Sequence, residues 1–236
     1  MPPNQTVYNR IALISGIFLG LFLLGRLALW FVYQPVFTEL GFIETLMAFM
    51  HGIRFDAAIT ITFLGIPFLF MMLPHKWFSS RIWQGLIHWY AYIVLIGFIF
   101  LTIGDLIYFG FVQRHAGPEV TLMTGDMELM LDMLLNEHRL PLIIFSVSAI
   151  IGAILWSKLF TSTITIPHRK LPRYGMIVVM FLAVIIVGRG GLQYKPARIS
   201  DAFLSGSTAS GYLTLNGPFA IFHSARGTRP VVKTFM

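Results

Sequence analysis

Five long apolar segments, separated by short polar stretches, dominate the chain. They cover residues 11–33, 57–73, 86–109, 141–160 and 174–188. About 20 apolar residues at 1.5 Å each cross a hydrocarbon core of roughly 30 Å, and the first, third and fourth segments reach that length. The second has 17 residues and the fifth has 15, so the fifth spans only if Arg173 and Arg189 reach from its ends to the two interfaces. The pattern predicts an all-α membrane protein with a bundle of five transmembrane helices.

The composition supports this prediction and excludes several kinds of site. Of the 236 residues, 56% are hydrophobic and 11% are charged, and mean hydropathy is +0.76. Soluble domains carry about 25% charged residues. Because the chain has no cysteine, a disulfide scaffold, a thiolate metal site and a cysteine nucleophile are all excluded. The net charge is +7, and its meaning depends on which side of the membrane the charges occupy.

The loops differ in charge between the two predicted sides of the membrane. Residues 1–10, 74–85 and 161–173 carry six Lys or Arg and no acid, whereas 34–56 and 110–140 carry three Arg and eight acids. Cytoplasmic loops are enriched in Lys and Arg. The N-terminus is therefore predicted to be cytoplasmic and, with five spans, the C-terminus extracytoplasmic.

Two stretches on the outer side have the pattern of amphipathic helices. From Glu119 to Arg139, the polar residues Glu128, Asp132 and Asn136 recur at i, i+4 spacing opposite a Met and Leu face. Such a helix lies on the membrane surface or against a partner domain, and burial against the bundle is the commoner fate of a Met-rich face. Residues Thr38 to His51 form a similar, more apolar stretch. We therefore expect interfacial amphipathic helices in the outer loops.

Charged residues within or next to the spans are the main candidates for a functional site. Arg26 lies in the outer half of the first predicted helix, and Asp105 lies about one turn from the outer end of the third. Such charges are costly in a membrane and mark functional sites by default. The two side chains either pair with each other or extend separately to water. At the same outer level the sequence places Arg54, Asp56, Arg114 and Arg189. Guanidinium groups bind phosphate bidentately, so this cluster would suit an anionic lipid head group.

The C-terminal part of the chain departs from the charge rule. Residues 189–236 carry six Lys or Arg against the single acid Asp201, although the predicted topology places them outside. A basic outer segment would be attracted to anionic head groups or phosphate-bearing substrates; the alternative is a solvated tail without a specific role. The sequence thus divides into a five-helix transmembrane domain, 1–188, and an extracytoplasmic juxtamembrane linker, 189–236.

Four short motifs, in order along the chain, resemble a known family. They are GIRFDA at 52–57, DLIYFGFVQR at 105–114, GRGGLQ at 188–193 followed by Lys195 and Pro196, and LNGPF at 215–219. Together they resemble the N-terminal membrane part of the lipoteichoic acid synthase family. These are the sulfatase-fold phosphoglycerol and phosphoethanolamine transferases of bacterial envelopes.

The resemblance implies a bundle in the bacterial inner membrane that anchors an extracytoplasmic sulfatase-like domain, in cis or in trans, and presents lipid to it. In that family the catalytic domain has a threonine nucleophile and a divalent metal, usually manganese. Such a domain needs some hundreds of residues, whereas 48 follow the fifth segment. No catalytic residue, metal ligand or cofactor is therefore expected in this chain, and the expected partners are the bilayer, anionic phospholipid and the sulfatase-like domain, with no nucleic acid.

Under this interpretation, the candidate residues have separate roles. Those expected to bind the lipid head group are Arg54, Arg114, Arg189 and Lys195, and those expected to support them are Arg26, Asp56, Asp105, Gln193 and Asn216. The two aspartates would orient arginines. Asn216 would cap a short helix with Pro218 in its first turn. The histidines His51, His115, His138 and His223 are scattered singly, which is typical of structural residues.

Two other functions remain open from the sequence. The chain could be a non-catalytic membrane scaffold, or half of a split enzyme, that docks a separate extracytoplasmic partner through its outer helix and basic tail. A small transporter is less favoured, because it would need central polar or unwound segments or a repeat between its halves. The charges cluster at the outer interface instead.

Overall fold

The computed structural model describes residues 5–73, 80–117, 139–159, 164–165, 170–204 and 207–227, and nearly all of these are helical. The long helices are α1 (Val7–Val32), α3 (Phe42–Met72), α4 (Arg81–Val112), α7 (Arg139–Leu159) and α8 (Lys170–Gly188). The short elements are α2 (Gln34–Phe37), η2 (Ile199–Phe203), α9 (Thr208–Thr214), α10 (Gly217–Gly227) and a parallel pair of two-residue strands, β1 (Gln5–Thr6) and β2 (Ile164–Thr165).

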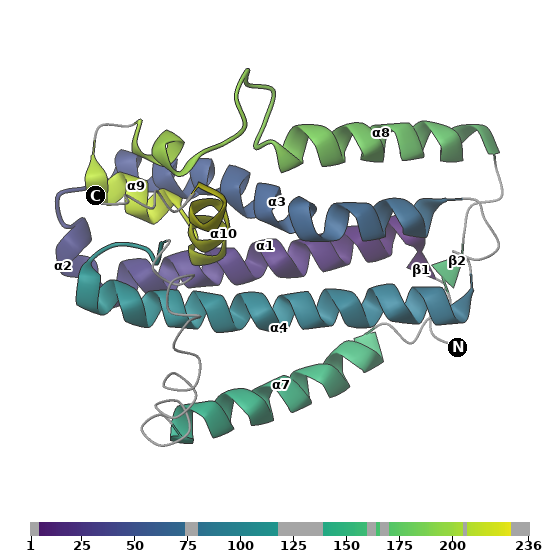
Figure 1. Ribbon diagram of the computed structural model, residues 1–236, viewed down its shortest axis with the longest axis horizontal. Helices are drawn as coiled ribbons and strands as arrows, with labels where there is room; N and C mark the ends of the chain where they lie inside the picture. Colours follow the sequence, from purple (N-terminus) through teal and green to yellow (C-terminus); the bar gives the residue numbers. More distant parts are fainter. Residues whose placement is uncertain are drawn as a thin grey trace, which may run out of the picture.

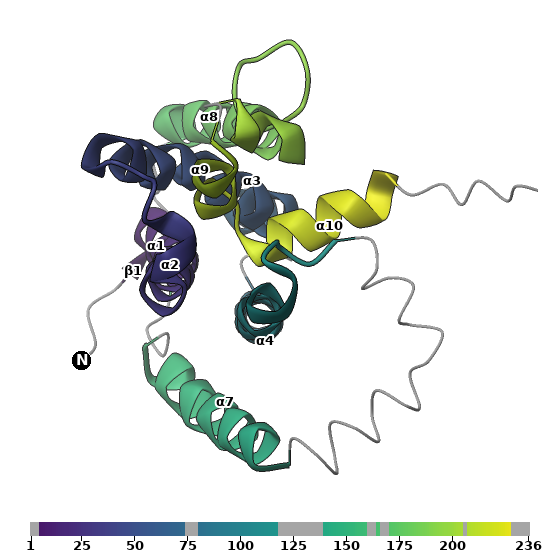
Figure 2. The ribbon, with the colours of Figure 1, turned by 90° about the vertical axis from the view of Figure 1, so that its left-hand side faces the viewer.

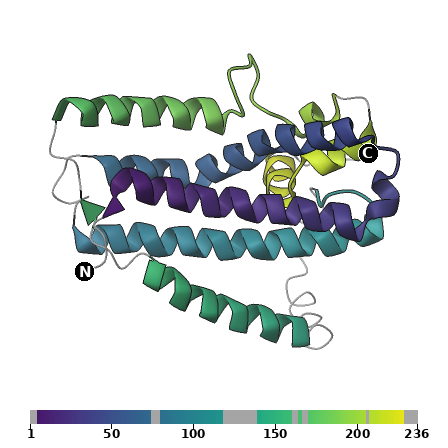
Figure 3. The same cartoon turned by 180° about the vertical axis from the view of Figure 1, so that it is seen from behind.

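Helices α1, α3 and α4 lie side by side and form the centre of the molecule (Figures 1 and 3). Helix α8 packs along α3 on one flank, whereas α7 touches α4 sparsely and diverges from it on the other flank (Figure 1). Aromatic side chains fill the centre: the rings of Phe18 and Phe98 meet edge to face at 5.8 Å, and Phe63 contacts Phe98 at 5.1 Å. Such ring pairs contribute about 0.5–1.5 kcal/mol each beyond their burial.

Four helices are long and apolar enough to cross a membrane: α1, α3, α4 and the Leu142–Leu159 part of α7. This confirms a multi-pass, all-helical membrane protein. Helix α8 contains a shorter apolar stretch, Tyr174–Gly188. At 1.5 Å per residue, α3 and α4 are about 47 and 48 Å long, whereas α8 is about 28 Å. Since the hydrocarbon core is roughly 30 Å thick, α3 and α4 are long enough to continue beyond it.

The two stretches expected to form interfacial helices have different outcomes. Residues 42–51, from the stretch Thr38–His51, are the first ten residues of α3, which runs without interruption to Met72. They therefore form part of a long helix rather than a separate interfacial one. The stretch from Glu119 to Arg139 lies outside the described residues, except for Arg139 at the start of α7.

The chain after α8 folds back onto the bundle. It turns at Gly190 and Gly191, whose φ angles of 79° and 127° are in the region that favours glycine. Beyond η2 and α9, helix α10 runs across the bundle and contacts both α3 and α4 (Figure 2). Its Phe219 ring packs edge to face on Phe55 at 4.9 Å, and Phe222 packs on Phe63 at 5.2 Å. Helices α9 and α10, which belong to the expected linker, thus pack into the bundle.

Candidate functional site

A buried ion pair joins α1 to α3. The guanidinium of Arg26 donates from Nη1 to Oδ2 of Asp56 at 3.0 Å and from Nη2 to Oδ1 at 2.9 Å. The two side chains are 1% and 2% exposed. A charge at such a site is stable only when it is paired and fully hydrogen-bonded, and the fork geometry meets that requirement.

The same arginine also binds the end of α9. Its Nε donates to the carbonyl of Leu213 at 2.8 Å, and Nη2 donates to the carbonyl of Thr214 at 3.2 Å. The last carbonyls of a helix have no partner within the helix and carry its partial negative charge. Arg26 therefore caps α9 from a helix that lies 187 residues earlier in the sequence.

A second pair, formed by Asp105 and His115, lies beside the first. Helix α4 ends at Gln113, which has a left-handed φ of 58°, and the chain then turns back so that His115 Nδ1 lies 2.7 Å from Asp105 Oδ2. The other carboxylate oxygen accepts from the backbone N–H of Ala116 at 2.8 Å. His115 Nε2 lies 2.7 Å from the carbonyl oxygen of Tyr212, the residue before Leu213 at the end of α9. Three consecutive carbonyls of α9 therefore lie within hydrogen-bonding distance of Arg26 or His115.

Asn216 connects the Arg26–Asp56 pair to α10. Its Nδ2 donates to Asp56 Oδ1 at 2.7 Å, and its Oδ1 accepts from the backbone N–H of Phe219 at 2.7 Å. The predicted role of Asn216 as the cap of a short helix is confirmed, with Pro218 in the first turn of α10. One amide side chain thus fixes the start of α10 to the carboxylate that holds Arg26.

The structure corrects the expected partners of two charges. Arg26 pairs with Asp56 instead of Asp105, and Asp105 orients His115 instead of an arginine. The alternative in which each charge extends to water is also wrong, because Arg26 and Asp105 are 3% and 5% exposed. Similar depth in the membrane suggested the Arg26–Asp105 pair, but depth does not say which side of each helix faces the other.

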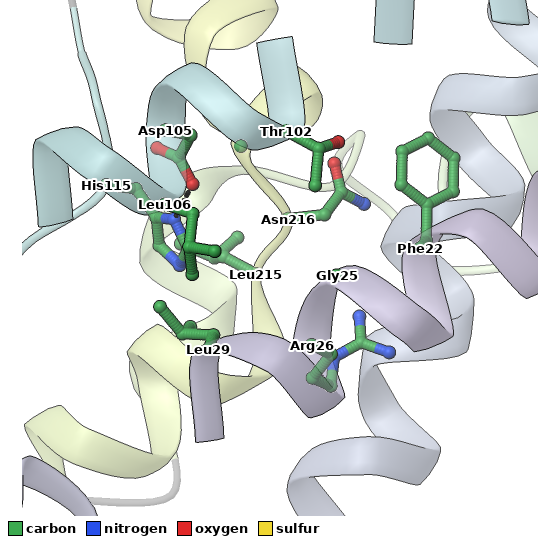
Figure 4. Close-up of a pocket in the computed structure, with 11 residues that line it drawn as sticks. Phe22, Gly25, Arg26, Leu29, Thr102, Asp105, Leu106, His115, Leu215 and Asn216 are labelled. Carbon is green, nitrogen blue, oxygen red and sulfur yellow. Dashed lines mark hydrogen bonds and ion pairs between the residues drawn. The ribbon is translucent and has the colours of Figure 1, made fainter. Parts of the chain in front are cut away.

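A small cavity lies beside Arg26, Asp105 and His115 (Figure 4). Its volume is about 20 Å³, and α1, α4 and the segment after α9 line it, with Arg26, Asp105, His115 and Asn216 among its walls. A volume of that size accommodates a water molecule. Pockets for ligands of drug size occupy hundreds of Å³. The buried charges therefore form a structural junction, with no space for a lipid head group.

Of the four residues predicted to bind the head group, three are exposed and the fourth, Arg54, is partly exposed. Arg54, on α3, is the least exposed of them: its Nη2 is 3.5 Å from Asp201 Oδ2, and its guanidinium lies 5.1 Å from the Phe55 ring. Arg114 is exposed next to the Tyr108 ring, and Arg189 donates to the carbonyl of Tyr194 at 3.0 Å. Lys195 is exposed, and the supporting residue Gln193 is partly buried.

Arg54 keeps unused hydrogen-bonding capacity. Its Nε and Nη2 have no hydrogen-bond partner among the residues that the structure describes, and the same holds for Nε2 of Gln193. The approach of Asp201 at 3.5 Å neutralises part of the charge without forming a hydrogen bond, and the same Oδ2 accepts from the Arg198 backbone N–H at 2.9 Å. Arg54 is therefore a partly exposed cation with two solvent-shielded donors that have no hydrogen-bond partner among the described residues.

Sequence reasoning missed His115 and the carbonyls of α9. His115 was treated as an isolated histidine, since nothing in the sequence marks Gln113 as a left-handed residue that would turn the chain back. The available signal was its position, ten residues after an intramembrane aspartate and just past the end of the apolar segment. Backbone carbonyls such as that of Tyr212 have no sequence signature.

No family model, curated protein or solved structure shows significant similarity to this chain. Within the described ranges, no group of three or more His, Cys, Asp or Glu side chains is arranged to hold a metal ion.

Proposed function

We propose that this chain is the membrane domain of a lipoteichoic acid synthase-like phosphoglycerol or phosphoethanolamine transferase, and that it holds the phosphate of an anionic envelope lipid at its outer surface. Helix α8 is the fifth span; the Lys and Arg bias of the loops places the N-terminus in the cytoplasm, so five spans place the C-terminus outside a bacterial inner membrane. A sulfatase-like domain outside, with a divalent metal, then acts on the lipid that the bundle presents.

The positions of the four family-like motifs support this proposal. The motif at 52–57 supplies Asp56, which bonds Asn216 of the motif at 215–219. The motif at 105–114 supplies Asp105, which contacts Gly217 so closely that a Cβ on this glycine would lie 2.5 Å from the Cβ of Asp105. Segments separated by up to 160 residues therefore meet at one junction.

The motif at 188–193 lies next to this junction. The carbonyl of Arg189 accepts from the backbone N–H of Ala197 at 2.8 Å, and Ala197 is buried in the same core as Phe219. The order of the motifs along the chain suggested the family. The residues that the motifs supply also pack together in the fold, which gives the motifs a shared structural role.

The single observation that carries the head-group assignment is Arg54. It combines a positive charge, a partly exposed side chain and two solvent-shielded donors that have no hydrogen-bond partner among the described residues. A phosphate oxygen can fill those donors by displacing the loosely placed Asp201 carboxylate, and charge-assisted hydrogen bonds to phosphate are about twice as strong as neutral ones. The attraction of Arg114, Arg189 and Lys195 at the same surface adds about 1 kcal/mol each for an anionic lipid.

The rigid junction beneath Arg54 has a role in this mechanism. Phosphoryl-group transfer depends on holding the phosphate in a fixed position, and positioning supplies several kcal/mol of the barrier. Arg54 lies two residues from Asp56, whose side chain is held by Arg26 and Asn216. The ion pair therefore fixes the turn of α3 that carries the phosphate-binding guanidinium.

Lipid binding by matched arginine variants tests the proposal. The purified protein in phosphatidylglycerol nanodiscs is compared with Arg54→Ala and with Arg81→Ala, a control that removes an exposed arginine at the opposite end of α4. Native mass spectrometry measures retained phosphatidylglycerol, with phosphatidylcholine as the neutral reference. We expect Arg54→Ala to weaken binding about tenfold, because one charged contact is worth about 1–2 kcal/mol at a partly exposed site.

Arg81→Ala should retain wild-type binding. A third variant, Asp201→Asn, removes the competing charge while keeping a side chain that can cap η2, and it should strengthen phosphatidylglycerol binding. Equal retention by the Arg54→Ala and Arg81→Ala proteins, both folded, would show that Arg54 does not hold the head group.

A further inference from the structure

His115 is a buried titratable residue that the proposed function does not use. It lies between two parts of the molecule, the outer end of α4 and the end of α9. The proposed head-group site and this histidine are on different elements, so the following inference stands independently of lipid binding.

The geometry of His115 requires a proton on Nε2 and a second proton between Nδ1 and Asp105 Oδ2. A backbone carbonyl only accepts hydrogen bonds, so Nε2 must donate to Tyr212 O at 2.7 Å. Nδ1 faces Asp105 Oδ2 at 2.7 Å, and the other oxygen of that carboxylate already accepts from Ala116 N. The arrangement is complete when an imidazolium faces a carboxylate on one side and a carbonyl on the other.

The surrounding charges favour this protonated pair. Asp105, on α4, is adjacent; Arg26 on α1 opposes a second positive charge, but Asp56 on α3 neutralises Arg26 bidentately. On α9, the Tyr212 side chain faces the imidazole with its ring at 6.1 Å. Burial by itself lowers the pKa of His115, but the Asp105 carboxylate and the hydrogen bond to the Tyr212 carbonyl outweigh it, and the pKa is raised above 6.5.

Deprotonation of His115 weakens its contact with α9 more than its contact with Asp105 on α4. A neutral imidazole can keep only one N–H, and the adjacent carboxylate retains it on Nδ1. Nε2 would then present a lone pair to the lone pairs of Tyr212 O at hydrogen-bonding distance, which is repulsive. The contact between His115 and α9 therefore requires the imidazolium.

We propose that protonated His115 acts as a latch that holds α9, and with it α10, against the bundle, so that the acidity of the adjoining solution controls their docking. Because the pKa is raised in the docked state, the stabilisation is fully present below the undocked pKa and is lost as pH rises through the docked pKa. Arg26 and Asn216 hold the same segment through hydrogen bonds that do not involve His115, so docking weakens while the helices stay attached.

A spin-label distance measurement tests the latch. The chain has no cysteine, so Thr208→Cys on α9 and Ile82→Cys at the far end of α4, both exposed, give one defined pair of labels. The distance distribution is recorded in nanodiscs between about pH 6 and about pH 9.5, a range that brackets a raised histidine pKa. We expect a single narrow distance at the acidic end and loss of that narrow distance at the alkaline end.

Two histidine variants complete the experiment. His115→Gln should give the broad distribution at every pH, whereas His51→Gln, the same change at an exposed histidine of α3, should follow the labelled wild type. If His115→Gln fails to fold, the pH series on the wild-type background still decides the matter. A wild-type distribution that stays narrow across the whole range would overturn the proposal, and so would an equal effect of His51→Gln.

Discussion

Two arginines on neighbouring helices, Arg26 and Arg54, are in opposite situations. The Arg26 pair with Asp56 is about 1–2% exposed and is joined by two hydrogen bonds of 2.9 and 3.0 Å. The Arg54 pair with Asp201 is 38% and 26% exposed and 3.5 Å apart, without a hydrogen bond among the described residues. Each guanidinium nitrogen of Arg26 donates a hydrogen bond within the protein. In contrast, Nε and Nη2 of Arg54 have no hydrogen-bond partner among the described residues.

The comparison separates the charged residues of this cluster into two kinds, buried ion pairs and loose surface pairs. A buried pair is costly to break, because removing one partner leaves an uncompensated charge. A loose surface pair is worth about 0–1 kcal/mol and is readily exchanged for another anion. Arg26 therefore determines structure, whereas Arg54 is the residue that we propose to bind an anion.

Removing Arg26 is expected to have the largest effect. Arg26→Ala leaves Asp56 buried without a cation and leaves the Leu213 and Thr214 carbonyls without donors, so stability should fall by about 3–5 kcal/mol. Denaturant-induced unfolding of the protein in micelles measures it, with Arg81→Ala as the control. If Arg26→Ala loses no more stability than Arg81→Ala, the Arg26 pair contributes as little to the fold as the loose surface pair of Arg54.

A pair of glycine variants tests the packing around Arg26. A Cβ on Gly52 would lie 2.3 Å from Cζ of Arg26, so Gly52→Ala must displace the guanidinium and should cost about 1–3 kcal/mol. Gly104, inside α4, has no atom within 4 Å of its Cβ position. Gly104→Ala should therefore leave stability unchanged or raise it by up to about 1 kcal/mol. Thermal unfolding that shifts both variants in the same direction would contradict this packing.

The cap at Asn216 should have a smaller effect. Asn216→Ala removes the cap of α10 and one hydrogen bond to Asp56, for an expected loss of about 1–2 kcal/mol. Hydrogen exchange at the amides of α10 should increase, and Asn9→Ala at an exposed position of α1 supplies the control. Unchanged exchange in α10 would mean that ring packing of Phe219 and Phe222 is sufficient to hold this helix.

The long helices were predictable from the sequence because apolar runs of membrane-spanning length permit few alternatives. The helix cap at Asn216, with Pro218 in the first turn, was also predictable, since capping is a local property of neighbouring residues. The pairing of Arg26 was not, because the sequence gives the depth of Asp56 and Asp105 but leaves open which face of each helix turns inward. The packing of α9 and α10 into the bundle was missed because their Gly, Ser and Asn content is typical of a linker.

The interactions of His115 depend on backbone geometry, which the residue types do not reveal. Its approach to Asp105 depends on the positive φ of Gln113, and its approach to α9 depends on a carbonyl. Neither leaves a pattern in the residue types. Arg54 was identified from its position just before the second apolar segment, at the predicted outer level, but its two unpartnered donors required the structure.

We infer that Arg26 stabilises the fold whereas Arg54 binds lipid. The most direct test of this difference is the increase in melting temperature that phosphatidylglycerol produces in the wild type and in Arg54→Ala. A ligand that binds the folded state raises stability according to its affinity, so loss of binding reduces the shift while basal stability stays the same. We predict an Arg54→Ala protein with the melting temperature of wild type in phosphatidylcholine and a much smaller increase on addition of phosphatidylglycerol. A full lipid-induced increase in this variant, or a lowered melting temperature without lipid, would contradict the account.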